Sequence, residues 1–346
     1  TGWKDSLELR TLPSGEVIHS AKFSTPGDLH CIGLAVHNGL LAVSLRPINL
    51  LVLFDTVARK QLGTMQLDDI GGVSFDEQGR LFVVTKKQVV RLDGKLRGIG
   101  FQPVVTPFIP SGTTNTDSLG GKKNTDRLEA YPTLSDPRQL LWDQGELFVA
   151  DLGPAHQVKV FDKDGKYLMA WGEKGNPPDD TRPGTFDAVH GVQVDPDTRK
   201  VYVTDRSSHR IEVFDENGKF LDQFSTGSPS TPQMLLFTAD KHLWVADNNT
   251  SKIIKYDLEG HYLYSWGSGG DFPGAMWNVH GMSVDQDEIG DPAALRAQRE
   301  ADRRLVVLIE RGPRVAKIAA RHRGHLADQI VDGDRKSTRL NSSHRT

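Results

Sequence analysis

Short apolar stretches separated by polar turns run through most of the chain, and residues 186–264 contain two consecutive copies of one pattern. Each copy has an apolar stretch, a turn centred on Asp, Gly or Asn, and a second stretch such as V-Y-V-T-D or L-W-V-A-D. A polar segment, a third stretch such as R-I-E-V-F-D and a D-x-x-G turn follow, and a fourth stretch ends the unit. Period-two alternation and short turns predict four antiparallel strands in each copy.

A unit of this size is incomplete by itself, because a small sheet buries only one face and needs further copies beside it. The chain carries six copies, so we expect an all-β fold, a six-bladed β-propeller of four-stranded antiparallel blades. The copies lie at 33–55, 71–94, 137–172, twice within 186–264, and at 280–333.

The repeats divide the chain into three parts. Residues 30–333 form the predicted propeller, and residues 1–29 form an N-terminal segment that can supply a ring-closing strand. Residues 334–344 (DRKSTRLNSSH) resemble the translation of a sequencing-library adapter, so we expect 334–346 to be an artefactual, disordered tail. Two insertions interrupt the repeats: a surface helix is expected at 289–303, and a mobile loop or lid at 107–134.

The charge composition disfavours partners that need a strong electrostatic field. The chain has 42 Lys plus Arg against 45 Asp plus Glu, and its sequence pI is about 6.4. We therefore expect neither a nucleic-acid nor a membrane partner. A monomer is expected, with a small molecule or peptide in the central channel or a protein on the top face. Cys31 is the single cysteine, so an intramolecular disulfide is impossible.

The third, fourth and fifth copies resemble NHL repeats, in phrases such as VADLGPAHQVKVFDKDG, VYVTDRSSHRIEVFDENG and LWVADNNTSKIIKYDLEG. This resemblance implies a six-bladed propeller, a fold that scaffolds, receptors and enzymes share. Copies three to six are also similar to the peptidyl-α-hydroxyglycine α-amidating lyases, which implies a secreted or periplasmic location. In that family, a histidine before the first-strand glycine of three alternating blades binds zinc in the central channel.

This chain has two of the three implied histidines. His190 and His280 each stand in a V-H-G context, and Gly71 occupies the third position. We expect both imidazoles to point towards the channel axis, where they bind zinc, or calcium, if His30, His156 or a carboxylate completes the shell. The alternative is that they are hydrogen-bonded channel residues. We call the matching positions of the six copies the ring positions: Ile32, Gly71, Arg138, His190, Gln233 and His280.

Arg206 is the candidate catalytic residue. It follows the second-strand aspartate of the fourth copy, and the resemblance implies that its guanidinium holds a substrate carboxylate. Arg46 and Lys86 stand at the same position in copies one and two, so we expect a cationic rim. The alternative is that Arg206 is a solvated residue at a blade turn. The catalytic tyrosine of the lyases has no counterpart, because the matched position is Gly153.

Three aspartates end the predicted second strands: Asp151, Asp205 and Asp247. Each stands directly before a polar turn. A carboxylate in such a position commonly accepts hydrogen bonds from nearby backbone amides. We therefore expect these aspartates to stabilise turns rather than to act as acids.

Three functions are compatible with these features. The first is a metal-dependent C–N lyase of the amidating type, or a relative acting on another small α-hydroxy or carboxylate compound. The second is a non-catalytic NHL propeller that binds a protein, a peptide or a glycan. The third is a calcium-dependent lactonase-type hydrolase, which should use channel carboxylates where this chain has His, Arg and Gln.

Overall fold

The computed structural model describes residues 6–12, 17–27, 29–85, 88–93, 104–107, 134–175, 182–238, 240–269, 279–284, 305–310 and 316–321. The expected helix at 289–303, nearly all of the loop at 107–134, and the tail at 334–346 lie outside these residues. Within the described ranges, no helix is long and apolar enough to cross a membrane.

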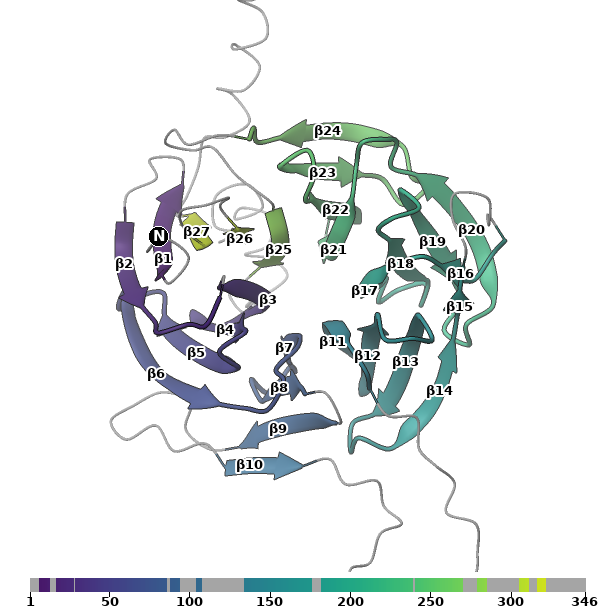
Figure 1. Ribbon diagram of the computed structural model, residues 1–346. Coiled ribbons are helices and arrows are strands. Elements are labelled where there is room, and N and C mark those ends of the chain that lie inside the picture. Colours follow the sequence, from purple (N-terminus) through teal and green to yellow (C-terminus); the bar gives the residue numbers. More distant parts are fainter. Residues whose placement is uncertain are drawn as a thin grey trace, which may run out of the picture.

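Five four-stranded sheets and one five-stranded sheet surround a common centre (Figure 1). Blade one contains β3 (His30–His37), β4 (Leu40–Arg46), β5 (Leu50–Asp55) and β6 (Lys60–Gln66). Blade two contains β7 (Val73–Phe75), β8 (Leu81–Val84), β9 (Val89–Asp93) and β10 (Val104–Pro107). Blade three contains β11 (Pro137–Asp143), β12 (Glu146–Asp151), β13 (Gln157–Asp162) and β14 (Tyr167–Trp171).

Blades four and five follow the same order. Blade four contains β17 (Val189–Val194), β18 (Val201–Asp205), β19 (Arg210–Phe214) and β20 (Phe220–Ser225). Blade five contains β21 (Pro232–Thr238), β22 (His242–Asp247), β23 (Lys252–Tyr256) and β24 (Tyr262–Trp266). A two-stranded ladder of β15 (Glu173–Lys174) and β16 (Thr185–Phe186) lies between blades three and four in sequence.

The five-stranded sheet combines the two ends of the described chain. It contains β25 (Val279–Val284), β26 (Leu305–Glu310), β27 (Ala316–Arg321), β1 (Ser6–Leu12) and β2 (Val17–Lys22). Strand β1 pairs with β27 in parallel and with β2 antiparallel. The prediction of six four-stranded antiparallel blades is therefore confirmed for five sheets and wrong for this one, because the N-terminal strands add to three C-terminal strands.

The hydrophobic core lies between neighbouring sheets. One cluster joins Leu53 of blade one to Leu81 of blade two, and another joins Phe148 of blade three to Phe214 of blade four. Leu7 of the five-stranded sheet packs with the core residues of blade one, such as Phe54. Each sheet thus buries its faces against two neighbours, as a repeat architecture requires.

A β-bulge begins the channel strand of blade four. The register of β17 and β18 shifts between Val189 and Val192, so that His190 and Gly191 stand opposite Thr204. The Gly191 N–H donates to Thr204 Oγ1 at 2.6 Å, and that hydroxyl donates to the Gln233 carbonyl of blade five at 2.7 Å. Similar shifts occur in β3, β11, β21 and β25. Because a bulge redirects a side chain, it sets the direction of the residue at the ring position.

Gly191 lies where blades four and five approach most tightly. A Cβ at this position would be 2.5 Å from the Gln233 carbonyl oxygen and 3.0 Å from Gln139 Oε1. Gly72 has a similar environment, since its Cβ would be 2.5 Å from the Leu140 nitrogen. The repeated first-strand glycine therefore allows one blade backbone to contact the next.

Replacing Gly191 by alanine is expected to destabilise the protein by about 1–3 kcal/mol, because the added methyl group overpacks the interface between blades. Gly27→Ala is the control, since its Cβ would have no heavy atom within 4 Å, and a change within about 0.5 kcal/mol is expected. Urea unfolding of both variants measures the difference. Equal stability of the two variants would contradict the close contact.

The aspartates that end the second strands bind backbone amides, as predicted. Asp205 Oδ1 accepts the N–H groups of Asp187 and Ala188 at 2.9 and 3.0 Å. Asp151 accepts the Asp136 N–H at 2.7 Å, and Asp247 accepts the Thr231 N–H at 3.1 Å. In each case the amide belongs to the segment that enters the channel strand.

A buried ionic network continues from Asp205 in blade four. The Arg210 guanidinium pairs with Asp205 at 3.2 Å and with Glu212 at 2.9 Å, and both carboxylate side chains are fully buried. Glu212 Oε2 also accepts the Gly184 N–H at 2.7 Å. Burial outweighs these contacts and raises the pKa of Glu212 from 4.5 to about 7.

The raised pKa of Glu212 predicts that the stability contribution of this residue decreases as the pH rises. The folded protein holds this proton more tightly than the unfolded chain, so the stabilisation is complete below about pH 4.5 and is lost as the pH rises to about 7. The loss is at most about 3 kcal/mol. Glu212→Gln cannot ionise, so its stability relative to wild type is expected to improve between pH 5 and pH 8. Chemical denaturation at both pH values tests this, and an unchanged difference would contradict it.

Candidate functional site

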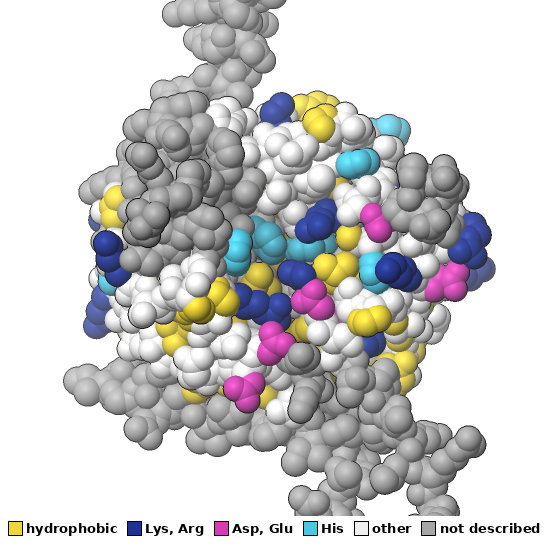
Figure 2. All heavy atoms as spheres, viewed as in Figure 1, with side chains coloured by type: hydrophobic (Ala, Val, Ile, Leu, Met, Phe, Trp, Pro, Cys, Tyr) yellow, Lys and Arg dark blue, Asp and Glu magenta, His cyan; other side chains and the backbone are white. Residues whose placement is uncertain are grey.

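The candidate site lies at one end of the central channel. Figure 2 shows His, Lys and Arg side chains gathered around the hollow centre of one face, with Asp and Glu side chains beside them. His190 comes from the bulge of β17, and His280 from the bulge of β25. Arg138 occupies the bulge of β11, and Arg206 directly follows β18. The bulges and the strand ends therefore supply the side chains of this site.

His190 and His280 are in contact. Their ring centroids are 4.9 Å apart and the planes meet at 71°, which is an edge-to-face arrangement. His190 is completely buried, and His280 is 7 % exposed. Neither ring nitrogen of His190 has a hydrogen-bond partner among the described residues. The alternative expectation of a hydrogen-bonded channel histidine therefore has no described protein group to supply the hydrogen bond at His190.

The environment of His190 favours a neutral ring. Burial, the neighbouring His280 and the guanidinium groups of Arg138 and Arg206 together hold the pKa of His190 well below 6.5. The imidazole is therefore uncharged at pH 7. A neutral ring can donate through one nitrogen and accept through the other.

Arg206 is half-buried, and its guanidinium forms no ion pair and no hydrogen bond in the part of the chain that the structure describes. Burial and the like charge of Arg138 lower the pKa of Arg206, whereas Asp187 raises it. The alternative expectation of a solvated residue at a blade turn stays a prediction, because Arg206 follows β18 directly and is partly exposed. A partly desolvated cation that forms no ion pair with a described carboxylate can attract an anion into the channel.

The other cations of the predicted rim differ from Arg206. Arg46 forms ion pairs with Asp69 at 3.4 Å and Asp136 at 3.2 Å, so its charge is compensated within the protein. Lys86 lies outside the described residues. Arg138 was a ring position without an assigned role, yet it adds a second cation here and shares Asp136 with Arg46. The sequence feature that could have indicated this role of Arg138 is a charged residue at a ring position.

Several buried polar atoms at the ring positions have no partner. Within the described ranges they include both nitrogens of His190, Nε of Arg138 and Oε1 of Gln233. Buried polar atoms are nearly always hydrogen-bonded in folded proteins. These atoms gather at one end of the channel, where water or a polar ligand could complete their hydrogen bonds.

The residues present do not fit the three-histidine zinc site that the resemblance implies. A Cβ at Gly71 would lie 2.8 Å from the Pro137 carbonyl oxygen, so a side chain has no room there. His156 is held elsewhere, with Nδ1 3.0 Å from the Phe186 carbonyl oxygen. No third His, Cys, Asp or Glu of the described residues joins the pair closely enough to form a three-ligand group. Two imidazoles alone are fewer than catalytic zinc usually requires.

The tyrosine of the lyases is also sterically excluded at its matched position. A Cβ at Gly153 would lie 2.2 Å from Cβ of Ser135. Tyr131, a conceivable substitute, lies outside the described residues. The catalytic arrangement implied by the resemblance is therefore incomplete at two positions.

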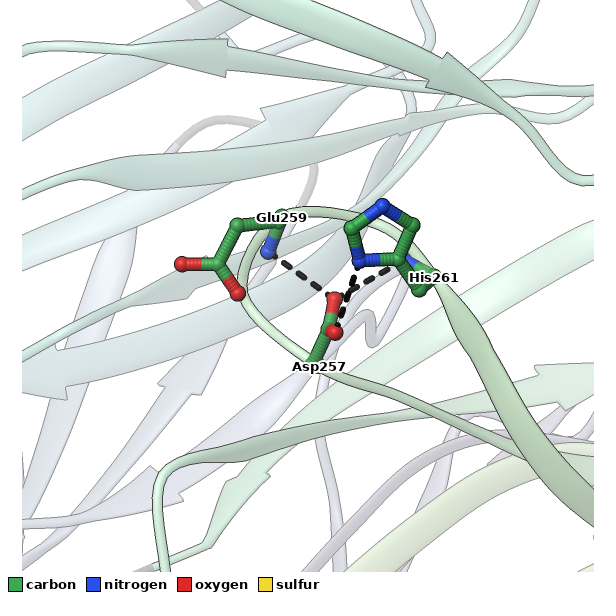
Figure 3. Close-up of side chains that lie close together, drawn as sticks. All are labelled: Asp257, Glu259 and His261. Atoms are coloured by element: carbon green, nitrogen blue, oxygen red, sulfur yellow. Dashed lines mark hydrogen bonds and ion pairs between the residues drawn. The ribbon is translucent and has the colours of Figure 1, made fainter.

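Asp257, Glu259 and His261 are the one group of three potential metal ligands found among the described residues (Figure 3). Asp257 Oδ1 accepts the N–H groups of Glu259 and His261 at 3.1 and 2.8 Å, and Oδ2 lies 2.9 Å from His261 Nδ1. Asp162 and Asp215 each accept, in the same way, the backbone N–H groups of the residues two and four positions later in the chain. The group is therefore explained by the repeated turn before the fourth strand.

The neutral state of His190 can be tested by NMR titration of its imidazole. We expect the pKa of His190 to lie well below 6.5 in the folded protein. The unfolded chain then binds a proton at a higher pH than the folded protein does, so this residue lowers the stability of the fold as the pH falls below about 6.5. Arg206→Met should raise the pKa of His190 only in part, because burial is the larger cause. Arg182→Met, at an exposed pair with Glu173, is the control. A wild-type titration near pH 6.5 would contradict the assignment.

Comparison with known proteins gives partial sequence matches. No family model matches the chain. It is 25 % identical over 125 residues to the protein brain tumor of Drosophila melanogaster, covering 36 % of this chain and 12 % of that protein. It is 37 % identical over 82 residues to peptidyl-glycine alpha-amidating monooxygenase A of Xenopus laevis, covering 23 % of this chain and 8 % of that protein. The chain thus spans a small part of both relatives.

Solved structures show the same fold at low sequence identity. A gluconolactonase from Xanthomonas campestris has a TM-score of 0.53 at 15 % identity, covering 81 % of this chain and 82 % of the other. Virginiamycin B lyase from Staphylococcus aureus has a TM-score of 0.50 at 14 % identity, covering 73 % and 74 %. A nidogen/laminin complex matches with a TM-score of 0.50 at 14 % identity, covering 74 % of this chain and 88 % of the other. The chain is therefore a β-propeller whose structural neighbours include a lactonase, a lyase and a laminin complex.

Proposed function

We propose that this propeller binds a carboxylate-bearing small molecule or peptide end in the central channel, with Arg206 as the carboxylate partner. The observation that carries the proposal is the half-buried guanidinium of Arg206, which has no ion pair and no hydrogen bond with a described residue, although the charge of Asp187 acts on it. A carboxylate can accept two parallel N–H groups from such a guanidinium.

The surrounding charges support an anionic ligand. Arg138 and Arg46 share the carboxylate of Asp136, and Arg138 also acts on Arg206 as a like charge. An anion next to Arg206 would reduce this repulsion and restore the hydrogen bonds lost on burial. The unpartnered nitrogens of His190 and Oε1 of Gln233 would then contact the polar groups beside the carboxylate.

Amidating-lyase-type chemistry is the second candidate, and the contact between His190 and His280 favours it. In such a reaction a neutral imidazole takes the proton of an α-hydroxyl group, the carbonyl forms, and the C–N bond breaks. The leaving nitrogen receives a proton. The partial match to the amidating monooxygenase supports this candidate, whereas Gly71 and Gly153 remove two residues that the lyases use. No step through zinc is proposed, because the pair lacks a complete ligand shell.

The channel site also assumes a closed six-bladed ring of the NHL type. We take the five-stranded sheet as the sixth blade, because Leu7 packs on blade one and Met282 packs with Leu236 of blade five. A closed ring would surround the channel on all sides and keep Arg206 partly desolvated.

The binding proposal is tested with an N-acylated α-hydroxyglycine and its neutral carboxamide counterpart. Calorimetry is expected to show tighter binding of the carboxylate, and Arg206→Met should weaken it by about tenfold or more, since hydrogen bonds to charged groups contribute about 1.5–3 kcal/mol. Arg182→Met should bind as wild type does. Equal affinity for the acid and the carboxamide, or unchanged affinity of Arg206→Met, would overturn the proposal.

Glyoxylate release measured on the same samples separates the two candidates. Release that His190→Gln abolishes supports the lyase, whereas carboxylate binding without release supports a binding protein and removes the lyase. Metal content belongs in the same experiment. One zinc per chain, lost in His190→Ala with His280→Ala, would overturn the conclusion that the pair lacks a zinc shell.

A further inference from the structure

A cavity of about 420 Å³ lies farther along the central channel than the carboxylate site. The channel strands lead into it: Ile32 marks the ring position of β3, and Leu34 and Val36 of the same strand line the cavity. Arg138 has the same relation to Leu140 and Trp142 in β11, which also line the cavity. Neither Arg206 nor the histidine pair lines this cavity, so it is separate from the carboxylate site.

Gln139 lies between the two regions. Its Nε2 donates to the Leu235 carbonyl at 3.0 Å, and its Oε1 accepts the Val192 N–H at 3.0 Å. The side chain thereby links blade three to blades four and five across the channel. Because both ends of the amide are engaged, Gln139 forms a fixed boundary rather than a ligand-seeking group.

The inner wall of the cavity is apolar and aromatic. Leu34, Val73, Leu236, Phe237 and Met282 line it together with Trp142. The Trp142 ring stacks on Phe82 at a centroid distance of 5.1 Å, and its Nε1 donates to Glu77 Oε2 at 2.8 Å. These apolar side chains form only part of the lining, because polar groups such as Ser74, Glu77 and Gln193 contribute most of the surface exposed in the cavity. A ligand that fits must therefore have both an apolar and a polar part.

Carboxylates supply the charge of the cavity. Asp76, Glu77 and Asp143 line it, and no Lys or Arg does so among the described residues. Arg80 compensates Asp76. Arg199 pairs with Asp143, but it also pairs with Glu146 at 2.7 Å and with Glu216 at 3.0 Å. One cation thus serves three carboxylates, and the pKa of Asp143 is raised by burial and by the charges of Glu77 and Glu146.

Gln193 provides a polar atom without a partner on this wall. The side chain is 8 % exposed and lines the cavity. Its Nε2 donates to the Leu235 carbonyl at 3.2 Å, whereas its Oε1 accepts no hydrogen bond from a described residue. An acceptor in an apolar wall favours a ligand that carries an N–H donor.

We propose that this cavity is a second ligand site that takes a small organic ammonium compound with an apolar body. The apolar body lies against Trp142, Phe237 and Met282. The ammonium group donates towards Gln193 Oε1 and is attracted by Glu77 and Asp143. This site thus prefers a cation, whereas the carboxylate site at the ring positions prefers an anion.

Three probes that share one apolar body test the proposal: 1-naphthylmethylammonium, 1-naphthylmethanol and 1-naphthaleneacetate. Calorimetry at neutral pH is expected to give saturable binding in the order ammonium, alcohol, carboxylate. Glu77→Gln should weaken ammonium binding by about threefold, as expected for a solvent-exposed charge pair, and leave alcohol binding unchanged. Glu173→Gln, an exposed residue that does not line the cavity, is the matched control.

Gln193→Leu provides a second, independent variant. It leaves the Leu235 carbonyl with the hydrogen bond from Gln139, so the fold is expected to persist, and thermal unfolding checks this. Both ammonium and alcohol binding should weaken, whereas Arg206→Met should change neither. No saturable binding of the ammonium probe, equal binding of the carboxylate, or full affinity in both Glu77→Gln and Gln193→Leu would overturn the proposal.

Discussion

The hydrogen bonds accepted by the second-strand aspartates are the constraint on which the channel site depends. In blade four, Asp205 binds the amides of Asp187 and Ala188 directly before the channel strand begins. His190 follows two residues after Ala188, so this carboxylate fixes the backbone from which the imidazole enters the channel. Because Asp205 is buried and paired with Arg210, removing it would leave two amides without partners and Glu212 as the one described carboxylate paired with Arg210.

This constraint explains how one backbone carries different chemistry in different blades. Blades four and five share the aspartate contact and the bulge, yet His190 corresponds to Gln233, and Arg206 corresponds to Asn248. The repeated hydrogen bonds fix where a ring-position side chain begins but not its type. Substitution at that position therefore changes the channel without changing the fold.

The sequence pattern was sufficient to predict five four-stranded blades and the roles of Asp151, Asp205 and Asp247. It also indicated that residues 1–29 can supply a strand that closes the ring, and β1 pairs with β27. It could not predict that this pairing is parallel or that β2 adds a further strand, because these contacts join distant parts of the chain. The steric closure at Gly71 depends on the Pro137 carbonyl of the next blade, which no local pattern reveals. Arg138 appeared at a ring position, but its role depends on the ion pairs around Asp136.

The channel also shows why a nearly neutral chain can bind charged ligands. The formal net charge is −3, yet Arg138 and Arg206 lie at the ring positions or beside them, whereas Glu77 and Asp143 line the cavity farther along. Gln139 lies between these regions and carries no charge. Opposite local potentials can therefore persist along one channel, because partial burial limits the screening of each group by water. Charge counts over the whole chain average out this separation, so the ligand preference of each region must be inferred from its own side chains.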